Sequence, residues 1–144
     1  MTVLFTPLGL TYGTLYSAIM LVLPKRVVVV TSREAITNIH SALDAARFYH
    51  KSFEVETHLL DDPLAGFGEG RALARFMAAS AAGDNIINLT GGTTVLQDCV
   101  RSVGEILRAQ QKKIREVAVI DRRSAEDQKR SPLVVGEMVE VPAL

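Results

Sequence analysis

The most informative stretch of the sequence is Asn85-Ile86-Ile87-Asn88-Leu89-Thr90-Gly91-Gly92-Thr93-Thr94. A short apolar run ends in a hydroxyl, two glycines and two more hydroxyls, and a long amphipathic pattern follows. This order predicts a buried strand, a tight turn and a helix, because glycine permits φ > 0 and the close approach of a ligand. The first turn of a helix has free N–H groups and the positive end of the helix dipole, and Thr93 or Thr94 is suited to cap it. The junction therefore predicts a site for an anionic ligand, most often a phosphate.

Length and charge narrow the classes to which the chain can belong. Its 144 residues suit a single domain spanning 1–144, and 48% of them are apolar, which is enough for a sizeable core. Sixteen basic residues balance sixteen acidic ones. This balance argues against binding to long nucleic acids, since proteins that coat them are visibly basic. Cys99 is the only cysteine, which we expect as a small core residue; no disulfide can form within the chain, and this suits a cytoplasmic protein.

The apolar run Leu15–Leu23 resembles part of a signal peptide or a membrane span. However, no basic region precedes it, and Pro24 ends it. It is also too short to cross a bilayer. We therefore predict a buried helix here and no membrane partner.

The hydrophobic pattern predicts strands that alternate with helices. The expected strands cover residues 3–6, 26–31, 53–60, 85–89, 116–121 and 133–141. The expected helices cover 14–23, 32–49, 71–82 and 94–113, while 122–131 reads as a polar connection without a helix. Such alternation is typical of an α/β, Rossmann-like, doubly wound and mostly parallel sheet. The last connection is too short for a crossover helix, so we expect the C-terminal strand to be antiparallel.

Two glycine-rich loops are expected side by side in this fold. Ligands of doubly wound sheets bind beyond the carboxyl ends of the strands, where the winding reverses. The first and fourth strands are the expected neighbours there, and they end in Gly9-Leu10-Thr11-Tyr12-Gly13-Thr14 and Thr90-Gly91-Gly92-Thr93-Thr94. Neither loop has the dinucleotide fingerprint or the P-loop lysine, which disfavours the common NAD and ATP enzymes. Ordinary turn chemistry is the alternative reading of both loops.

Other polar residues near this edge of the sheet have less specific patterns. Asp61 and Asp62 follow the third strand as either an acid–base pair or an Asp-Asp-Pro turn. Ser32 and Arg33 open the second helix close to the same edge. The polar connection carries Arg122, Arg123, Lys129 and Arg130. These cations either close over a phosphodiester or form a solvated loop. The three histidines lack the clustering that a metal site requires, so no metal is expected.

At two places the sequence resembles the CRISPR-associated Rossmann fold (CARF) family. The first is Phe5-Thr6-Pro7-Leu8-Gly9-Leu10-Thr11-Tyr12-Gly13-Thr14-Leu15-Tyr16-Ser17-Ala18-Ile19, and the second is Asn88-Leu89-Thr90-Gly91-Gly92-Thr93-Thr94, which is similar to the family's N/D-L-T-G-G-T loop. The resemblance implies a homodimer that binds a cyclic oligoadenylate across its two-fold axis, with the tetra-adenylate favoured over the hexa-adenylate. The ligand contacts expected from this resemblance are Gly9, Leu10, Thr11, Tyr12, Gly13, Thr14, Ser32, Arg33, Thr90, Gly91, Gly92, Thr93, Thr94 and Gln97.

Members of the family that are similar to this chain include ring nucleases. The implied reaction is attack of a ribose 2′-hydroxyl on the neighbouring phosphate, which yields a linear product with a 2′,3′-cyclic phosphate and needs neither metal nor cofactor. The implied catalytic candidates are Thr11, Arg122, Arg123 and Lys129. Two other functions stay open. One is a sensor, sponge or regulatory subunit that binds the same ligand and leaves it intact. The other is a nucleotide- or sugar-phosphate enzyme outside the family that uses Asp61 and Asp62.

Overall fold

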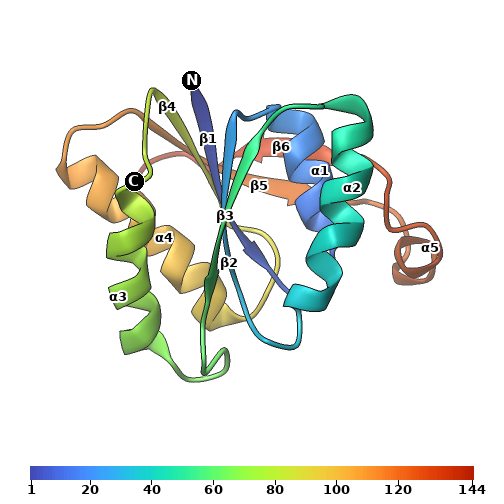
Figure 1. The fold of residues 1–144 in the computed structure, drawn as a ribbon, viewed down its shortest axis with the longest axis horizontal. Helices are drawn as coiled ribbons and strands as arrows, with labels where there is room; N and C mark the ends of the chain where they lie inside the picture. Colours follow the sequence, from blue (N-terminus) through green and yellow to red (C-terminus); the bar gives the residue numbers. More distant parts are fainter.

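The apolar runs of the sequence pair into one six-stranded sheet in the computed structural model, which describes residues 1–144 (Figure 1). The strands are β1 (Thr2–Leu8), β2 (Arg26–Thr31), β3 (Glu54–Leu59), β4 (Asp84–Asn88), β5 (Ile114–Ile120) and β6 (Glu137–Glu140). Their order is β3-β2-β1-β4-β5-β6, with every pair parallel except β5 and β6. This confirms the predicted α/β, Rossmann-like class and its antiparallel C-terminal strand.

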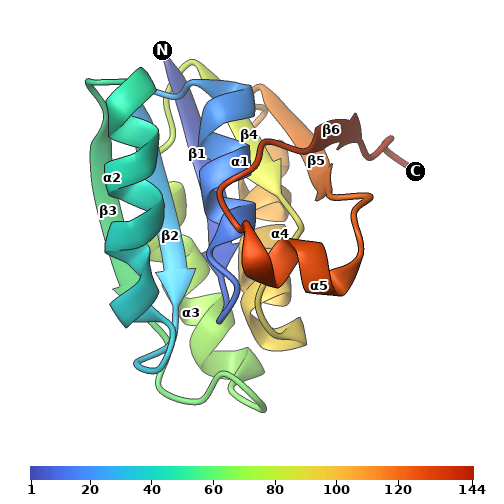
Figure 2. The same cartoon turned by 90° about the vertical axis from the view of Figure 1, so that its right-hand side faces the viewer.

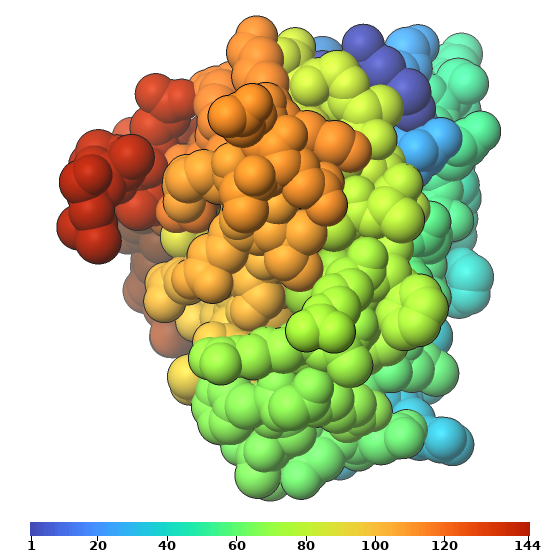
Figure 3. Space-filling model, turned by 90° about the vertical axis from the view of Figure 1, so that its left-hand side faces the viewer, coloured from blue at the N-terminus to red at the C-terminus, as the bar shows by residue number.

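Helices cover both faces of the sheet. On one face lie α1 (Gly13–Val22) and α2 (Ile39–Tyr49), which the 3₁₀ turn η1 (Ile36–Asn38) precedes; on the other lie α3 (Phe67–Ala78) and α4 (Thr94–Ala109). Figure 3 shows α3 and α4 side by side over their face. The short α5 (Ala125–Arg130) stands beside the sheet on the β5–β6 connection (Figure 2). None of these helices is long and apolar enough to cross a membrane.

The core lies in two layers, one on each side of the sheet. Val27 and Val29 of β2 face α1 and α2, whereas Val28 and Val30 face α3 and α4. All four valines are fully buried. This explains the uninterrupted β-branched run, because a central parallel strand that is covered on both faces needs no polar side.

Two helix starts differ from the prediction. The helix expected at 71–82 begins four residues earlier, at Phe67, and Gly68 and Gly70 lie inside it. Gly70 packs against Cys99 of α4, where an added Cβ would lie 3.5 Å from the Cys99 Cβ. The expected helix at 32–49 begins only at Ile39, because the Ser32 hydroxyl accepts a hydrogen bond from the Ala35 N–H and closes a separate turn first.

The C-terminal connection also differs from the prediction. It contains α5, whose start is capped by Ser124 through a hydrogen bond from the Asp127 N–H. This helix has no buried residue, so no apolar periodicity marks it in the sequence. The last strand is shorter than the expected 133–141, because it pairs with β5 only from Glu137 to Glu140.

Candidate functional site

The two glycine-rich loops lie next to each other, because β1 and β4 are neighbours in the sheet. Their backbones touch: a Cβ added to Gly9 would lie 2.7 Å from the Cα of Gly92. The winding of the chain also reverses between these two strands, since β2 and β3 lie on one side and β5 on the other. The structure therefore places both predicted loops together at the position where such sheets bind ligands.

The second loop depends on glycine for its shape. Gly91 has φ +101° and Gly92 has φ +73°, values that L side chains rarely adopt. The side chain of Gln97 donates to the carbonyl oxygen of Gly91 at 3.2 Å and so closes the loop from the first turns of α4. Gly92 is exposed and Gly91 half-buried, while the Gln97 amide holds the conformation of the loop.

The hydroxyls on either side of these glycines hold the loop in place. Thr90 Oγ1 accepts a hydrogen bond from the Val119 N–H of β5 at 2.8 Å. Thr93 Oγ1 accepts from the Leu96 N–H at 3.3 Å and donates to the Pro63 carbonyl at 2.5 Å. Of the two predicted caps, Thr93 is therefore the N-cap of α4. This helix has 16 residues, and the N–H groups of its first turn have no partner within the helix. The positive end of its dipole therefore faces the loop.

A groove of about 510 Å³ opens between these loops and the ends of β2 and β3. Its lining includes most of both loops and part of the segments after β2 and β3: Gly9, Leu10, Thr11, Thr14, Ser32, Glu34, Ala35, Asp62, Pro63, Leu64, Gly91, Gly92, Thr93 and Leu96. The volume falls in the range of small-molecule sites. Both the backbone at the start of α4 and the acidic residues Glu34 and Asp62 line the groove. A phosphate suits the backbone amides, and groups that donate hydrogen bonds suit the carboxylates.

A second hollow, of about 320 Å³, lies on the other side of the first loop. Leu10, Thr11 and Tyr12 line it together with α5 residues, Lys129 among them. The Lys129 ammonium takes part in none of the ion pairs of the chain. The structure thus places an unpaired cation beside the predicted catalytic hydroxyl of Thr11.

The other two basic candidates are already paired. Arg122 forms an ion pair with Glu137 of β6 at the surface. Arg123 forms a two-point pair with Asp121, with Nε 3.0 Å from Oδ1 and Nη2 2.8 Å from Oδ2. These hydrogen bonds lower the pKa of Asp121 and raise the pKa of Arg123. Only Lys129 is therefore both next to the first loop and free to meet an anion.

The predicted residues after β2 and β3 differ in burial and in their partners. Ser32 is buried, and Arg33 is exposed and lies 3.7 Å from Asp61 in an ion pair. Asp62 Oδ1 accepts hydrogen bonds from the N–H groups of Leu64 and Ala65, which is the geometry of the Asp-Asp-Pro turn.

The remaining members of the predicted set lie on the two glycine-rich loops. Gly13 begins α1 and packs against Pro132, Thr14 lines the groove, and Thr94 is the exposed first residue of α4.

Sequence reasoning did not identify Glu34 and Gln128. Glu34 lies three residues after the end of β2, and its position near the carboxyl end of a central strand is the signal that could have identified it. Gln128 belongs to α5 and had no such signal. No group of three or more His, Cys, Asp or Glu side chains is arranged to hold a metal ion.

Comparison with known proteins gives a structural match only. No family model and no curated protein sequence matches the chain. Among solved structures, Can2 from Sulfobacillus thermosulfidooxidans in complex with cyclic tetra-adenylate has a TM-score of 0.65 at 12% identity, over 83% of this chain and 32% of Can2. Protein VC1899 from Vibrio cholerae has a TM-score of 0.57 at 12% identity, over 83% of this chain and 30% of its own. The chain thus spans about a third of the length of these proteins, and the likeness establishes the fold.

Proposed function

We propose that this chain binds a cyclic oligoadenylate at the two-fold axis of a homodimer and cleaves it to linear products with 2′,3′-cyclic phosphate ends. The observation that carries the proposal is the pair of touching glycine-rich loops at the ends of β1 and β4. The fold shared with Can2, which was solved with cyclic tetra-adenylate, supports that ring as the first ligand to test. The resemblance of the two loop motifs to the CARF family supports the same choice.

Ligand binding follows from what the loops offer. Backbone N–H groups at the start of α4 are preorganised donors for phosphate oxygens, and their helix dipole favours negative charge. A cyclic tetranucleotide has internal rotational symmetry, and an isologous dimer presents each loop twice around one axis. The ring and the dimer can therefore share a two-fold axis, with each protomer contacting half of the phosphates.

Cleavage requires few protein groups. The ribose 2′-oxygen forms a bond to the adjacent phosphorus, the bond from that phosphorus to the 5′-oxygen breaks, and the 2′-hydroxyl proton is released while the 5′-oxygen gains one. The exposed Thr11 hydroxyl orients the reacting phosphate, and the Lys129 ammonium stabilises the negative charge that develops on it. Orientation and fixed positive charge together account for substantial rate acceleration without a metal.

Binding without cleavage is the second candidate function, and one observation favours it. None of the three histidines lines the groove or the hollow beside Lys129, so neither space holds a side chain with an ordinary pKa near neutrality. A site without such a general base turns its ligand over slowly or leaves it intact. Asp61 and Asp62 give no comparable support to an enzyme outside this class, because one pairs with Arg33 and the other closes its turn.

The test is to incubate the purified chain with cyclic tetra-adenylate, and separately with cyclic hexa-adenylate, in the presence of EDTA. Calorimetry measures binding, and chromatography with mass detection follows the ring and its linear products. We expect conversion of the tetra-adenylate under single-turnover conditions. Binding without conversion would favour the second candidate, and absence of binding to both rings would refute both.

A lysine variant then tests the assigned chemistry. Lys129→Ala should reduce the single-turnover rate by about 10²-fold, because it removes a fixed charge at the reacting phosphate. Lys112→Ala is the matched control: Lys112 is exposed and unpaired, and it follows α4 at the end remote from the loops. Equal rates for the two variants would remove Lys129 from the mechanism.

A further inference from the structure

The position of α5 is the feature that the proposed function leaves unexplained. The helix has six residues, and none of them is buried. A helix this short is unstable by itself, and without an apolar face it gains little from packing. Polar contacts must therefore hold α5, and with it Lys129, beside the first loop.

Arg123 supplies most of these contacts. Its guanidinium binds both carboxylate oxygens of Asp121 at the end of β5. Its Nη1 donates to the Ser131 carbonyl at 2.9 Å and to the Asp127 carbonyl at 3.4 Å. One planar group thus connects the end of β5 to the middle of α5 and to its C-terminal end, which a flexible ammonium cannot do in one geometry.

Gln128 adds a second connection from inside the helix. Its Nε2 donates to the Asp121 carbonyl at 3.2 Å and to the Arg123 carbonyl at 2.9 Å. The Gln128 side chain therefore points back to the strand end, while Lys129, the next residue, lies along the hollow beside the first loop. Fixing Gln128 in this way also fixes the direction of its neighbour.

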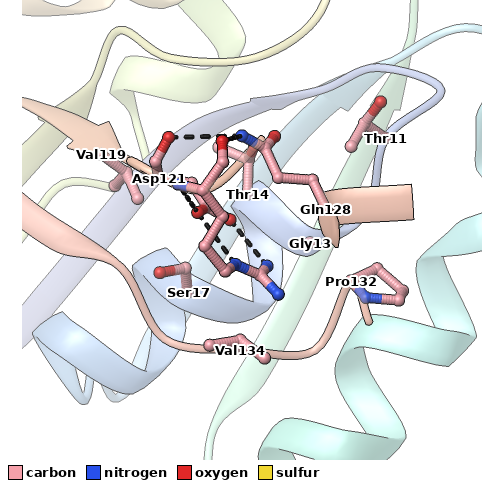
Figure 4. A pocket seen from close by; sticks show the side chains of 10 residues that line it. Thr11, Gly13, Thr14, Ser17, Val119, Asp121, Gln128, Pro132 and Val134 are labelled. Atoms are coloured by element: carbon pink, nitrogen blue, oxygen red, sulfur yellow. Dashed lines mark hydrogen bonds and ion pairs between the residues drawn. The ribbon is translucent and has the colours of Figure 1, made fainter. Parts of the chain in front are cut away.

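The segment after α5 then packs against the first loop and α1. A Cβ added to Gly13 would lie 2.4 Å from the Pro132 carbonyl oxygen, so the two backbones are in contact there. The Gly136 N–H donates to the Ser17 hydroxyl of α1 at 2.7 Å. Figure 4 shows the small cavity of about 30 Å³ that remains between Asp121, Gln128 and the start of α1, with Thr11 at its edge.

From these contacts we infer that Asp121, Arg123 and Gln128 form a clamp that positions Lys129 against the first loop, so that Arg123 acts through Lys129 and does not itself bind the phosphate. This inference rests on the proposed function for its effect on cleavage. The clamp itself is a property of the free protein. We assign the three side chains as positioning residues, since the hydrogen bonds of each go to other groups of the protein.

The first experiment measures the clamp without any ligand. Hydrogen exchange of the free chain is compared for the wild type, Arg123→Gln and Arg115→Gln. Arg115 is the matched control, since it pairs with Glu140 at the other end of β5. We expect Arg123→Gln to raise amide exchange by about tenfold in residues 124–131 and 9–14 only, because exchange reports local opening. Unchanged exchange in these segments would overturn the clamp, whatever the activity.

The second experiment asks whether Arg123 acts through Lys129. Arg123→Gln should lower the single-turnover rate on cyclic tetra-adenylate about tenfold and change the Kd less than about threefold. In a Lys129→Ala background the same substitution should have no further effect, because residues that act as a unit are not additive. Arg123→Lys should recover little of the lost rate, since an ammonium cannot make the hydrogen bonds of the planar guanidinium in one geometry.

The outcomes separate the two proposals. A Kd that weakens as much as the rate falls would show that Arg123 binds the ligand directly, and additive losses in the double variant would show that it acts independently of Lys129. Either result overturns the positioning role. A wild-type chain that binds no ring refutes the proposed function, while the exchange data still decide on the clamp.

Discussion

Gly92 has the backbone conformation on which the second loop depends. Its φ is +73°, and an added Cβ would lie 2.9 Å from Leu96 Cδ1. We expect Gly92→Ala to lower the free energy of unfolding by roughly 1–3 kcal/mol, because the new side chain adds backbone strain and a clash. Urea unfolding followed by circular dichroism measures this change.

Gly68→Ala is the matched control for that substitution. Gly68 lies inside α3, and a Cβ there would meet no atom within 4 Å. Alanine has a higher helix propensity than glycine, so this variant should have an unchanged free energy of unfolding or one raised by up to about 1 kcal/mol. A similar loss in both variants would mean that the positive φ of the loop is not the cause.

Cys99 allows a second prediction at this scale. Burial, with a smaller effect from the charge of Asp98, raises the pKa of the Cys99 thiol to about 12. At pH 8 the thiolate fraction is then on the order of 10⁻⁴, so an aromatic disulfide reagent should label the native chain far more slowly than the chain in denaturant. The native rate should rise with pH toward that pKa. Rapid native labelling at pH 8 would contradict the burial of this thiol.

At the scale of elements, the start of α4 depends on one hydroxyl. Thr93 caps the helix and also donates to the Pro63 carbonyl, which connects the loop after β4 to the loop after β3. Thr93→Ala should cost about 1 kcal/mol and lower the Tm by about 2–4 °C. Thr94→Ala is the control, since Thr94 is exposed and makes no side-chain hydrogen bond, and its Tm should stay within about 1 °C of the wild type. Equal shifts would show that Thr93 is not the cap.

Elements with an apolar signature were predictable from the sequence, and elements without one were not. The valine run of β2 predicts a central strand that is covered on both faces, as the structure has it. The glycines after β4 likewise predict the loop that the structure contains. In contrast, α5 has no buried side chain, so its polar sequence is typical of a loop as much as of a helix. Its helical start depends on the Ser124 cap, and the spacing of Ser124 and Asp127 was the one sequence signal for it.

The candidate site also has features that the sequence predicts and features that it does not. Topology alone places the first and fourth strand ends together, because parallel strands with right-handed crossovers leave few alternatives. Which basic residue is free could not be predicted, since it depends on partners that come from other elements. Arg122 pairs with Glu137 fifteen residues later, and Arg123 pairs with Asp121 only where α5 also brings the carbonyls of Asp127 and Ser131 to its guanidinium. Lys129 is distinguished only because its neighbours are paired and it is not.

At the scale of the whole molecule, the chain has zero net charge, so its electrostatic potential is strong only close to individual groups such as the start of α4. Long-range attraction of an anion is therefore weak, so the binding that we propose would depend on short-range contacts with the loop amides and Lys129. Glu34 and Asp62 also line the groove, and Asp62 precedes Pro63, whose carbonyl binds Thr93 at the start of α4. These acidic residues limit where in the groove a phosphate can bind favourably.

The last prediction concerns assembly. Leu10 is 65% exposed at the rim of the loops, next to the surface that the proposed function shares between protomers. We expect light scattering to give a mass of twice the 15.7 kDa of the chain, and calorimetry to give one cyclic tetra-adenylate for two chains. Linear tetra-adenylate with a 2′,3′-cyclic phosphate end is the matched control, because it has the same four phosphates and four bases but lacks the symmetry of the ring and must lose more freedom on binding. One ring for each chain, with equal affinity for the linear form, would contradict binding on a two-fold axis.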